Sequence, residues 1–387
     1  LLMNPSSAPL VTAQANGFNW VNKQRDWIRS VFPNDNTADF LSTTNVNQSQ
    51  TCNAFFNGTS TNYYTAGGGC NNTCYSSVVA HEMGHWLNVL YGTGNGSDGM
   101  GEGNADIFSI YMLDDPLVAP FFYTNGSPIR DATNNRQFCG DLSPGCYGAV
   151  HTDGEVWMGA AWKIRTRLNG SLGNALGDLQ SSLLFLGWMN SYNQTGINSI
   201  IETQWLTLDD NDGNIGNGTP NYAEIDGGFR QQGFPGFGLQ FVAFSNVTQL
   251  ATTTDEVGPY AVSADVIATI NPPLSTATLR YRVNGGAIQV VPMTNTGGDT
   301  FVASIPGQPA PAGVEYVITG QDSVGSSNSF PSSDLAQGLT FAVGQVNTIY
   351  ATTFEPGPSS WIRTGGTATS GLWVHGDPNG TAAQPED

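Results

Sequence analysis

The chain has 387 residues, of which 12 are Lys or Arg and 31 are Asp or Glu, so its formal net charge is −19. So acidic a chain repels phosphate backbones, which argues against nucleic-acid binding. The contents of 39% hydrophobic and 11% aromatic residues argue against disorder.

The length predicts two or three domains. No apolar run reaches the roughly 18 residues of a transmembrane helix, so we expect no membrane-spanning segment. The first residues lack the basic and apolar regions of a signal peptide. Because the sequence starts at Leu1 rather than at a methionine, we expect a processed or partial form.

The first predicted elements are a helix and a short hairpin. Apolar residues at helical spacing predict a helix over residues 18–31. A strand is expected over residues 54–56, a turn at Asn57-Gly58 and a second strand over residues 62–64. A glycine-rich loop then leads to the segment with the clearest chemistry.

Residues 76–91 predict a helix with a serine cap, which carries the sequence His81-Glu82-x-x-His85. Positions four apart lie within about 40° of each other on a helix, so two imidazoles can bind one metal ion from one side. Glu82 lies about 60° from His85, where its carboxylate can act as a general base without binding the metal. A chance match is expected on the order of once in a thousand such sequences. Two buried core histidines are the alternative, but three of the four histidines fall in or near this cluster.

A zinc ion needs a third protein ligand and an open position for water. The pattern with a third histidine is excluded, because Asn88 and Tyr91 stand at the relevant positions. Glu102 instead opens the next helical segment, and Asp106 follows one turn later on the same face. We predict that Glu102 completes the zinc site and that Asp106 holds the N–H of a ligand imidazole. The alternative is a helix start that is enriched in acids for dipole reasons.

The five cysteines form no CxxC pair, which favours structural disulfides over a thiolate metal site. Cys139 and Cys146 are expected to form a local bridge. A bridge between Cys52 and Cys70 would leave Cys74 free. Exchanging Cys70 for Cys74 is the open alternative, and the Cys74 thiolate is a minor candidate for a zinc-bound latency device.

A second cation site is possible further along the chain. Oxygen donors cluster around Gly213 and suit Ca²⁺; they are Asp209, Asp210, Asp212 and Asn214. The register of an EF-hand is broken, because its first position would be Leu208. A solvated turn ahead of a helix over residues 220–225 is the equal alternative.

The composition changes near residue 235. Short alternating runs with turns at roughly ten-residue spacing predict an antiparallel β-sandwich of the Ig/Fn3-like kind; they cover residues 260–267, 277–283, 287–291, 301–305 and 315–319. The Asn284-Gly285 step predicts a hairpin. We expect domains at residues 1–235 and 236–344, and the start of a truncated third β domain at 345–387.

Three segments together resemble those of the thermolysin-like zinc metallopeptidases, the gluzincins, and more closely their fungalysin-like relatives. The segments are His81–His85, Gly101–Asp106 and Val150–Trp157. The resemblance covers roughly residues 45–235 and implies an α+β fold with a β-rich N-lobe, a helical C-lobe and a cleft floored by the zinc helix. It also implies peptide-bond hydrolysis by water activated on zinc, with His81, His85 and Glu102 as ligands and Glu82 as the base.

The resemblance implies roles for further residues. His151 would donate to the oxyanion of the tetrahedral intermediate; the alternative is a loop histidine beside Tyr147 and Asp153. Asn53 and Ala54 would belong to an edge strand whose backbone pairs with the substrate. Arg130 would contact a substrate carbonyl, with a surface salt bridge as the even alternative.

The chain also departs from the thermolysin pattern. Cys146 stands where an acid would orient His151, so Asp153 and Asp141 are the candidate substitutes. The oxyanion-assisting tyrosine has no clear counterpart, because that region reads Gly-Thr-Gly-Asn. The unranked candidates are Tyr91, Tyr111 and Tyr147. Only 80 residues precede His81, the first predicted zinc ligand, so the β lobe is short or partly missing.

The sequence therefore predicts a secreted or cell-surface zinc endopeptidase that acts on polypeptide substrates. Zn²⁺ is the expected cofactor, Ca²⁺ is a candidate second one with the solvated turn as its equal alternative, and no nucleic-acid partner is expected. The rivals are another zinc hydrolase, such as an aminopeptidase or amidase, and a surface adhesion protein with a vestigial metal site. The oligomeric state is not predicted.

Overall fold

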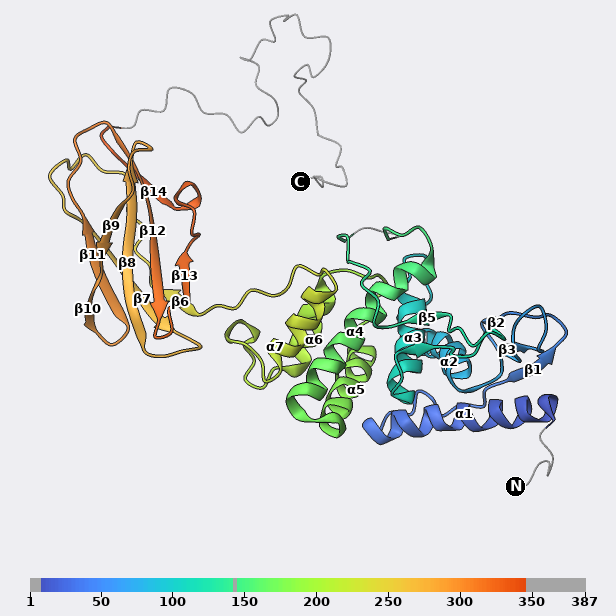
Figure 1. The fold of residues 1–387 in the computed structure, drawn as a ribbon. Coiled ribbons are helices and arrows are strands. Elements are labelled where there is room, and N and C mark those ends of the chain that lie inside the picture. The colour runs from blue at the N-terminus through green and yellow to red at the C-terminus, as the bar shows by residue number, and fades with distance from the viewer. Residues whose placement is uncertain (1–7, 142–144, 346–387) are drawn as a thin grey trace, which may run out of the picture. The chain divides into compact units, whose positions relative to one another are not determined.

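The structure is a computed structural model that describes residues 8–141 and 145–345, and the chain divides into two compact units (Figure 1). The first unit comprises residues 1–241 with 269–271, and the second comprises residues 242–268 with 272–387. The first boundary therefore falls at residue 241 rather than at 235. The expected third domain, from 345 on, lies outside the described residues apart from its first residue.

The first unit combines helices with short strands, as the α+β prediction required. Its helices are α1 (Pro9–Val31), α2 (Ser76–Tyr91), α3 (Met100–Leu113), α4 (Val150–Leu172), α5 (Asn174–Ser191), α6 (Ile200–Asp209) and α7 (Tyr222–Gln231), with a 3-10 turn at Ile215–Asn217. Its strands are β1 (Thr44–Gln48), β2 (Ala54–Phe56), β3 (Thr61–Tyr64), β4 (Leu117–Val118) and β5 (Arg130–Asp131).

Helix α1 begins nine positions earlier than predicted, at Pro9, and ends at Val31 as predicted. The extra turns have small residues on their buried face. A Cβ on Gly17 would lie 3.0 Å from Thr44 and 3.4 Å from the Cys74 sulfur, so the helix packs closely there. Small residues carry little hydrophobic periodicity, which is why the pattern of large apolar residues missed these turns.

Three tryptophans from different helices form the centre of the first unit. Trp157 of α4 contacts Trp188 of α5 at a ring distance of 5.4 Å and Trp205 of α6 at 5.3 Å. All three are fully buried. This core fixes the position of α4, whose first turn reaches the candidate site.

A small sheet with the strand order β1-β3-β2 lies beside α2. Strand β2 pairs antiparallel with β3, and the turn between them is closed by the Asn57 side chain, which accepts bonds from the Thr59 and Ser60 backbone N–H groups. The predicted hairpin is confirmed, and β2 stands at the sheet edge.

The second unit consists of two antiparallel sheets. Its strands are β6 (Val242–Ser245), β7 (Tyr260–Ala268), β8 (Leu274–Val283), β9 (Gln289–Pro292), β10 (Thr294–Gly297), β11 (Thr300–Ile305), β12 (Ala312–Asp322), β13 (Ser327–Phe330) and β14 (Leu339–Val343), with a 3-10 turn at Leu335–Gln337. One sheet has the order β10-β11-β7-β6; the other has the order β13-β12-β8-β9, with β14 also on β12.

Alternate side chains of these strands are buried, as in Val262, Leu279 and Val314. All five predicted runs are strands, and the hairpin at Asn284-Gly285 joins β8 to β9. Across the described residues of both units, no helix has the length and apolar character needed to cross a membrane.

Candidate metal centre

The close packing of α2 on α3 brings the predicted ligands together. A Cβ on Gly84 would lie 2.7 Å from the Ala105 Cα, so the two helices touch through a glycine. Helix α2 has the predicted bounds, but the serine cap was wrong: the N-cap is Tyr75, and no side chain caps the first turn. The backbone of Tyr75 is extended. The distance between α2 and α3 is determined further along α2, by the contact of Gly84 with Ala105.

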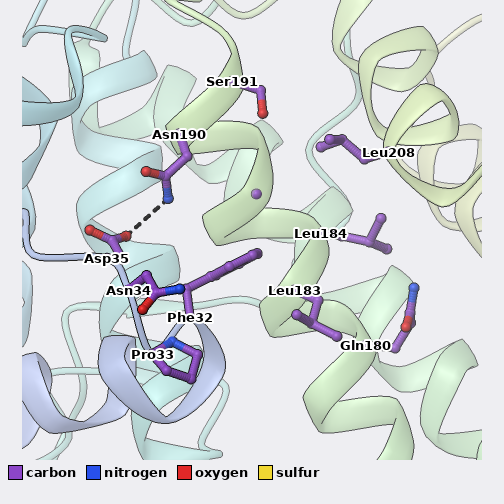
Figure 2. A pocket seen from close by; sticks show the side chains of 11 residues that line it. Phe32, Pro33, Asn34, Asp35, Gln180, Leu183, Leu184, Asn190, Ser191 and Leu208 are labelled. Carbon is purple, nitrogen blue, oxygen red and sulfur yellow. Dashed lines mark hydrogen bonds between the residues drawn. The ribbon is translucent and has the colours of Figure 1, made fainter.

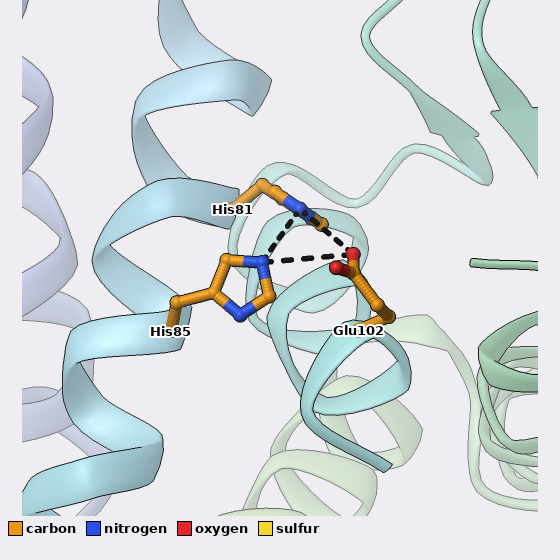
Figure 3. Close-up of side chains that lie close together, drawn as sticks. All are labelled: His81, His85 and Glu102. Carbon is orange, nitrogen blue, oxygen red and sulfur yellow. Dashed lines mark hydrogen bonds and ion pairs between the residues drawn. The ribbon is translucent and has the colours of Figure 1, made fainter. Parts of the chain in front are cut away.

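His81 and His85 of α2 point toward Glu102 of α3 (Figure 3). The two Nε2 atoms lie 3.1 Å apart, and they are 3.4 and 3.6 Å from Glu102 Oε2. In the described part of the chain, these side chains form the one group of three or more His, Cys, Asp or Glu whose donor atoms all lie within 4.8 Å of one another. The structure thus brings together the three predicted ligands.

Asp106 lies behind His81, as predicted. Its Oδ1 is 2.8 Å from His81 Nδ1, and its two oxygens accept bonds of 2.7 Å from the Arg130 guanidinium. Arg130 is therefore paired, but the pair is buried rather than the surface salt bridge of the alternative. Burial would raise the pKa of Asp106, but Arg130 and His81 outweigh it and lower that pKa.

The charges of the cluster suit a bound cation. Burial alone would lower the pKa of His81, but Asp106 and Glu102 outweigh it and raise that pKa to about 10. The Glu102 Oε2 atom is buried and without a hydrogen-bond donor. Burial would raise the pKa of the Glu102 carboxyl, but the two imidazoles outweigh it and lower that pKa. A metal ion bound between the imidazoles and the carboxylate would supply the positive charge that this cluster attracts, so the residues fit a metal site.

Glu82 shares a small hollow of about 80 Å³ with His81, His151 and Arg130. Burial is the main cause that raises the pKa of Glu82, against the opposing effect of the two imidazoles. Asn53 and Ala54 line the same hollow from the sheet edge. The remaining walls are apolar and were not predicted; they are Val78, Val118, Ala119, Phe122 and Ile129.

His151 is the second residue of α4 and keeps an exposed side chain with 59% accessibility. Its Nε2 lies 3.4 Å from Glu102 Oε1. Burial and the neighbouring cations lower its pKa more than Glu102 raises it.

Neither acid that we considered as an orienting partner for His151 is used in that way. Asp153 accepts a bond from the Tyr147 backbone N–H, and Asp141 accepts two bonds from Ser199. Glu102 is the carboxylate that the structure places against His151.

The hydroxyls of the three tyrosine candidates for the oxyanion have other partners. The Tyr91 hydroxyl donates to Asp35, the Tyr111 hydroxyl to the Ala161 carbonyl and the Tyr147 hydroxyl to the Gln137 carbonyl. None of them lines the hollow that contains Glu82.

Asn95, which the sequence reasoning missed, contacts the second imidazole. Its Oδ1 lies 2.9 Å from His85 Nδ1. The signal available was the Gly-Thr-Gly-Asn segment, residues 92–95, which had no assigned role.

Both predicted disulfides form, Cys52–Cys70 and Cys139–Cys146. Cys74 is free and buried, and its sulfur donates to the Ala13 carbonyl at 3.2 Å. Burial raises the pKa of Cys74 to about 12. The thiol therefore stays protonated and packs on α1, which argues against the latency device.

The oxygen donors of the possible calcium site do not act together. Asp209 is buried and accepts bonds from Gln180, Thr219 and Asn221. Asp210, Asp212 and Asn214 accept bonds from backbone N–H groups two residues further on. These contacts match the solvated-turn alternative, and calcium stays a prediction.

A larger hollow of about 690 Å³ lies between the end of α1 and helices α5 and α6 (Figure 2). Its walls include Phe32, Leu184 and Leu208. Asp35 at its edge accepts bonds from Asn190 and Tyr91. This carboxylate therefore joins α5 to the end of α2 and is not part of a metal cluster.

In comparisons with known proteins, no family model matches the sequence, and no curated protein matches it either.

Proposed function

We propose that the chain is a secreted zinc-dependent endopeptidase of the thermolysin-like kind. The observation that carries the proposal is the convergence of His81, His85 and Glu102 beside Glu82 in one hollow. Two imidazoles and one carboxylate form a ligand set that zinc hydrolases use, with a position left open for water. The two disulfides are compatible with an extracellular location.

Zinc bound there would polarise the scissile carbonyl and lower the pKa of a water molecule. The chain's own residues supply the remaining roles. Glu82 takes a proton from the attacking water and passes it to the leaving amine. His151, with an exposed imidazole at the rim of the hollow, donates to the oxygen that becomes negative.

The substrate chain is proposed to pair with the edge strand β2, whose first residue, Ala54, lines the hollow together with the preceding residue Asn53. The apolar walls beside Arg130 would receive an apolar substrate side chain. Arg130 reaches the hollow while its guanidinium is held by Asp106, so it can contact a substrate carbonyl without moving.

The aminopeptidase rival requires an acid that anchors the substrate amine. Among the residues that line the hollow, Glu82 is the one carboxylate, and the proposal already uses it. An intact Glu82 beside intact ligands also disfavours a vestigial site. The residues of the hollow therefore support an endopeptidase better than an aminopeptidase.

The test is hydrolysis of casein and of N-blocked peptides before and after chelation by o-phenanthroline. We expect activity that chelation removes and Zn²⁺ restores, and a Glu102→Gln variant that neither binds zinc tightly nor cleaves. Activity that survives full chelation would reject the proposal. Cleavage confined to peptides with a free amino terminus would favour the aminopeptidase.

A further inference from the structure

Asn95 lies in the loop between α2 and α3 and is exposed, yet its side-chain amide makes three hydrogen bonds. We propose that Asn95 is a positioning residue that fixes the tautomer and ring orientation of His85, so that its Nε2 faces the metal. The inference rests on the proposed metal site. It assigns a role to the Gly-Thr-Gly-Asn segment, which lacks the tyrosine of the thermolysin pattern.

Two backbone carbonyls determine how the amide is oriented. Asn88 is fully buried, and its Nδ2 donates to the Gly101 carbonyl at 2.9 Å and to Asn95 Oδ1 at 3.0 Å. Asn95 Nδ2 donates to the His85 carbonyl at 3.0 Å. A carbonyl oxygen can only accept, so both amides have one possible orientation.

The oriented amide determines the protonation of the imidazole. Asn95 Oδ1 lies 2.9 Å from His85 Nδ1 and can only accept, so Nδ1 must carry the hydrogen. The lone pair of a neutral His85 is then on Nε2, the atom that faces Glu102 Oε2 at 3.6 Å. Partners of this kind orient metal-binding histidines.

Gly101, the residue before the ligand Glu102, makes room for Asn95. A Cβ on Gly101 would lie 2.7 Å from Asn95 Oδ1 and 2.8 Å from the Asn95 Cα. A glycine inside α3 lowers helix propensity, and here it leaves a notch that the asparagine fills. Asn95 and Gly101 therefore act as a pair.

The loop is also held against α2, which limits the motion of Asn95. The Asn88 carbonyl accepts bonds from the Gly94 backbone N–H at 2.9 Å and from the Thr93 hydroxyl at 3.2 Å. His81 is held by a carboxylate of α3, whereas His85 is held by a neutral amide of this loop. The two imidazoles are thus positioned by different elements.

The experiment measures zinc affinity by competition with a chromogenic chelator, together with the Tm of the metal-free protein. Asn95→Ala is expected to weaken zinc binding about 10- to 100-fold, the range found for residues that orient metal ligands, with little change in Tm. Asn95→Asp keeps the acceptor for His85 Nδ1 but loses the donor to the His85 carbonyl, so it is expected to keep part of the affinity that Asn95→Ala loses. Ser97→Ala, in the same exposed loop, is the matched control and should bind as the wild type does.

Gly101→Ala is expected to reproduce the loss, because its methyl group displaces Asn95. Wild-type affinity in Asn95→Ala would overturn the inference.

A readout without metal separates this inference from the proposed function. The ¹⁵N spectrum of the His85 imidazole in the metal-free protein, at a pH where the ring is neutral, should show the Nδ1–H tautomer in the wild type and a mixture in Asn95→Ala. If the wild type binds no zinc, the proposed function fails. If both proteins show the same tautomers, the role of Asn95 is rejected instead.

Discussion

Gly84 of α2 and Ala105 of α3 approach so closely that a Cβ on Gly84 would lie 2.7 Å from the Ala105 Cα. Gly84 stands between the base Glu82 and the ligand His85, and Ala105 stands between the ligand Glu102 and Asp106. The distance between α2 and α3 is thus determined by residues that belong to the same sequence motifs as the metal ligands. No flexible side chain lies between them that could absorb a larger residue.

This contact predicts that Gly84→Ala destabilises the protein. Overpacking against backbone costs about 1–3 kcal/mol, which exceeds the gain of about 1 kcal/mol from replacing a helical glycine. The free energy of unfolding in urea measures the effect. Gly170→Ala in α4 is the matched control, because a Cβ there meets nothing within 4 Å, and it should be neutral or stabilising. Equal behaviour of the two variants would contradict the packing account.

The buried Asp106–Arg130 pair predicts two separable effects. Asp106→Asn leaves the Arg130 charge buried and should cost about 3–5 kcal/mol of stability. It should also weaken zinc binding about 10- to 100-fold, because His81 exchanges a negatively charged partner for a neutral amide. In Asp106→Asn/Arg130→Met, the stability should recover in part while the zinc affinity stays low. Recovery of both quantities together would show that Asp106 acts only through the fold.

His151 is expected to affect turnover but not metal binding. His151→Gln should lower kcat by about 10²–10³, the usual loss of one oxyanion donor, with KM and zinc content near those of the wild type. Its exposed side chain makes a folding defect unexpected. A variant that loses zinc would instead identify His151 as a metal ligand.

The raised pKa of Glu202, a residue outside the metal cluster, predicts that the stability of the protein depends on pH. Burial and the hydrogen bond with Asp226 raise its pKa from 4.5 to about 8. The folded protein therefore binds more protons than the unfolded chain between these values. The stabilisation is present below pH 4.5 and is lost as the pH rises through about 8.

Glu202→Gln should remove this decline, because glutamine stays neutral and can still donate to Asp226. The free energy of unfolding in urea, measured at pH 5 and at pH 8 for both proteins, checks this prediction. A decline of the same size in wild type and variant would show that another group is responsible.

Much of the site could be predicted because its chemistry is local in the sequence. His81 and His85 share one helix face by spacing, and Glu102 and Asp106 share another. Helix α2 follows from periodicity and the Cys139–Cys146 bridge from cysteine spacing, whereas the choice of Cys70 over Cys74 as the partner of Cys52 did not. The strands of the second unit follow from their alternating pattern.

The rest depends on contacts between segments that are distant in sequence. Asn95 carries no recognisable signal, because its role arises only when Gly101 of the next helix leaves space for it. The proposed partners Asp153 and Asp141 failed for the same reason, since backbone N–H groups of neighbouring loops use them. The early turns of α1 were missed because close packing there needs small residues.

The most direct measurement is the zinc content of the wild type and of Glu82→Gln, each followed by a casein digest. Both proteins should hold one equivalent of zinc, because Glu82 is not a ligand. Only the wild type should cleave casein at full rate, and the variant should be slower by about 10²- to 10⁴-fold. A wild-type protein that binds no zinc in excess metal, or a variant that cleaves at the wild-type rate, would contradict the account.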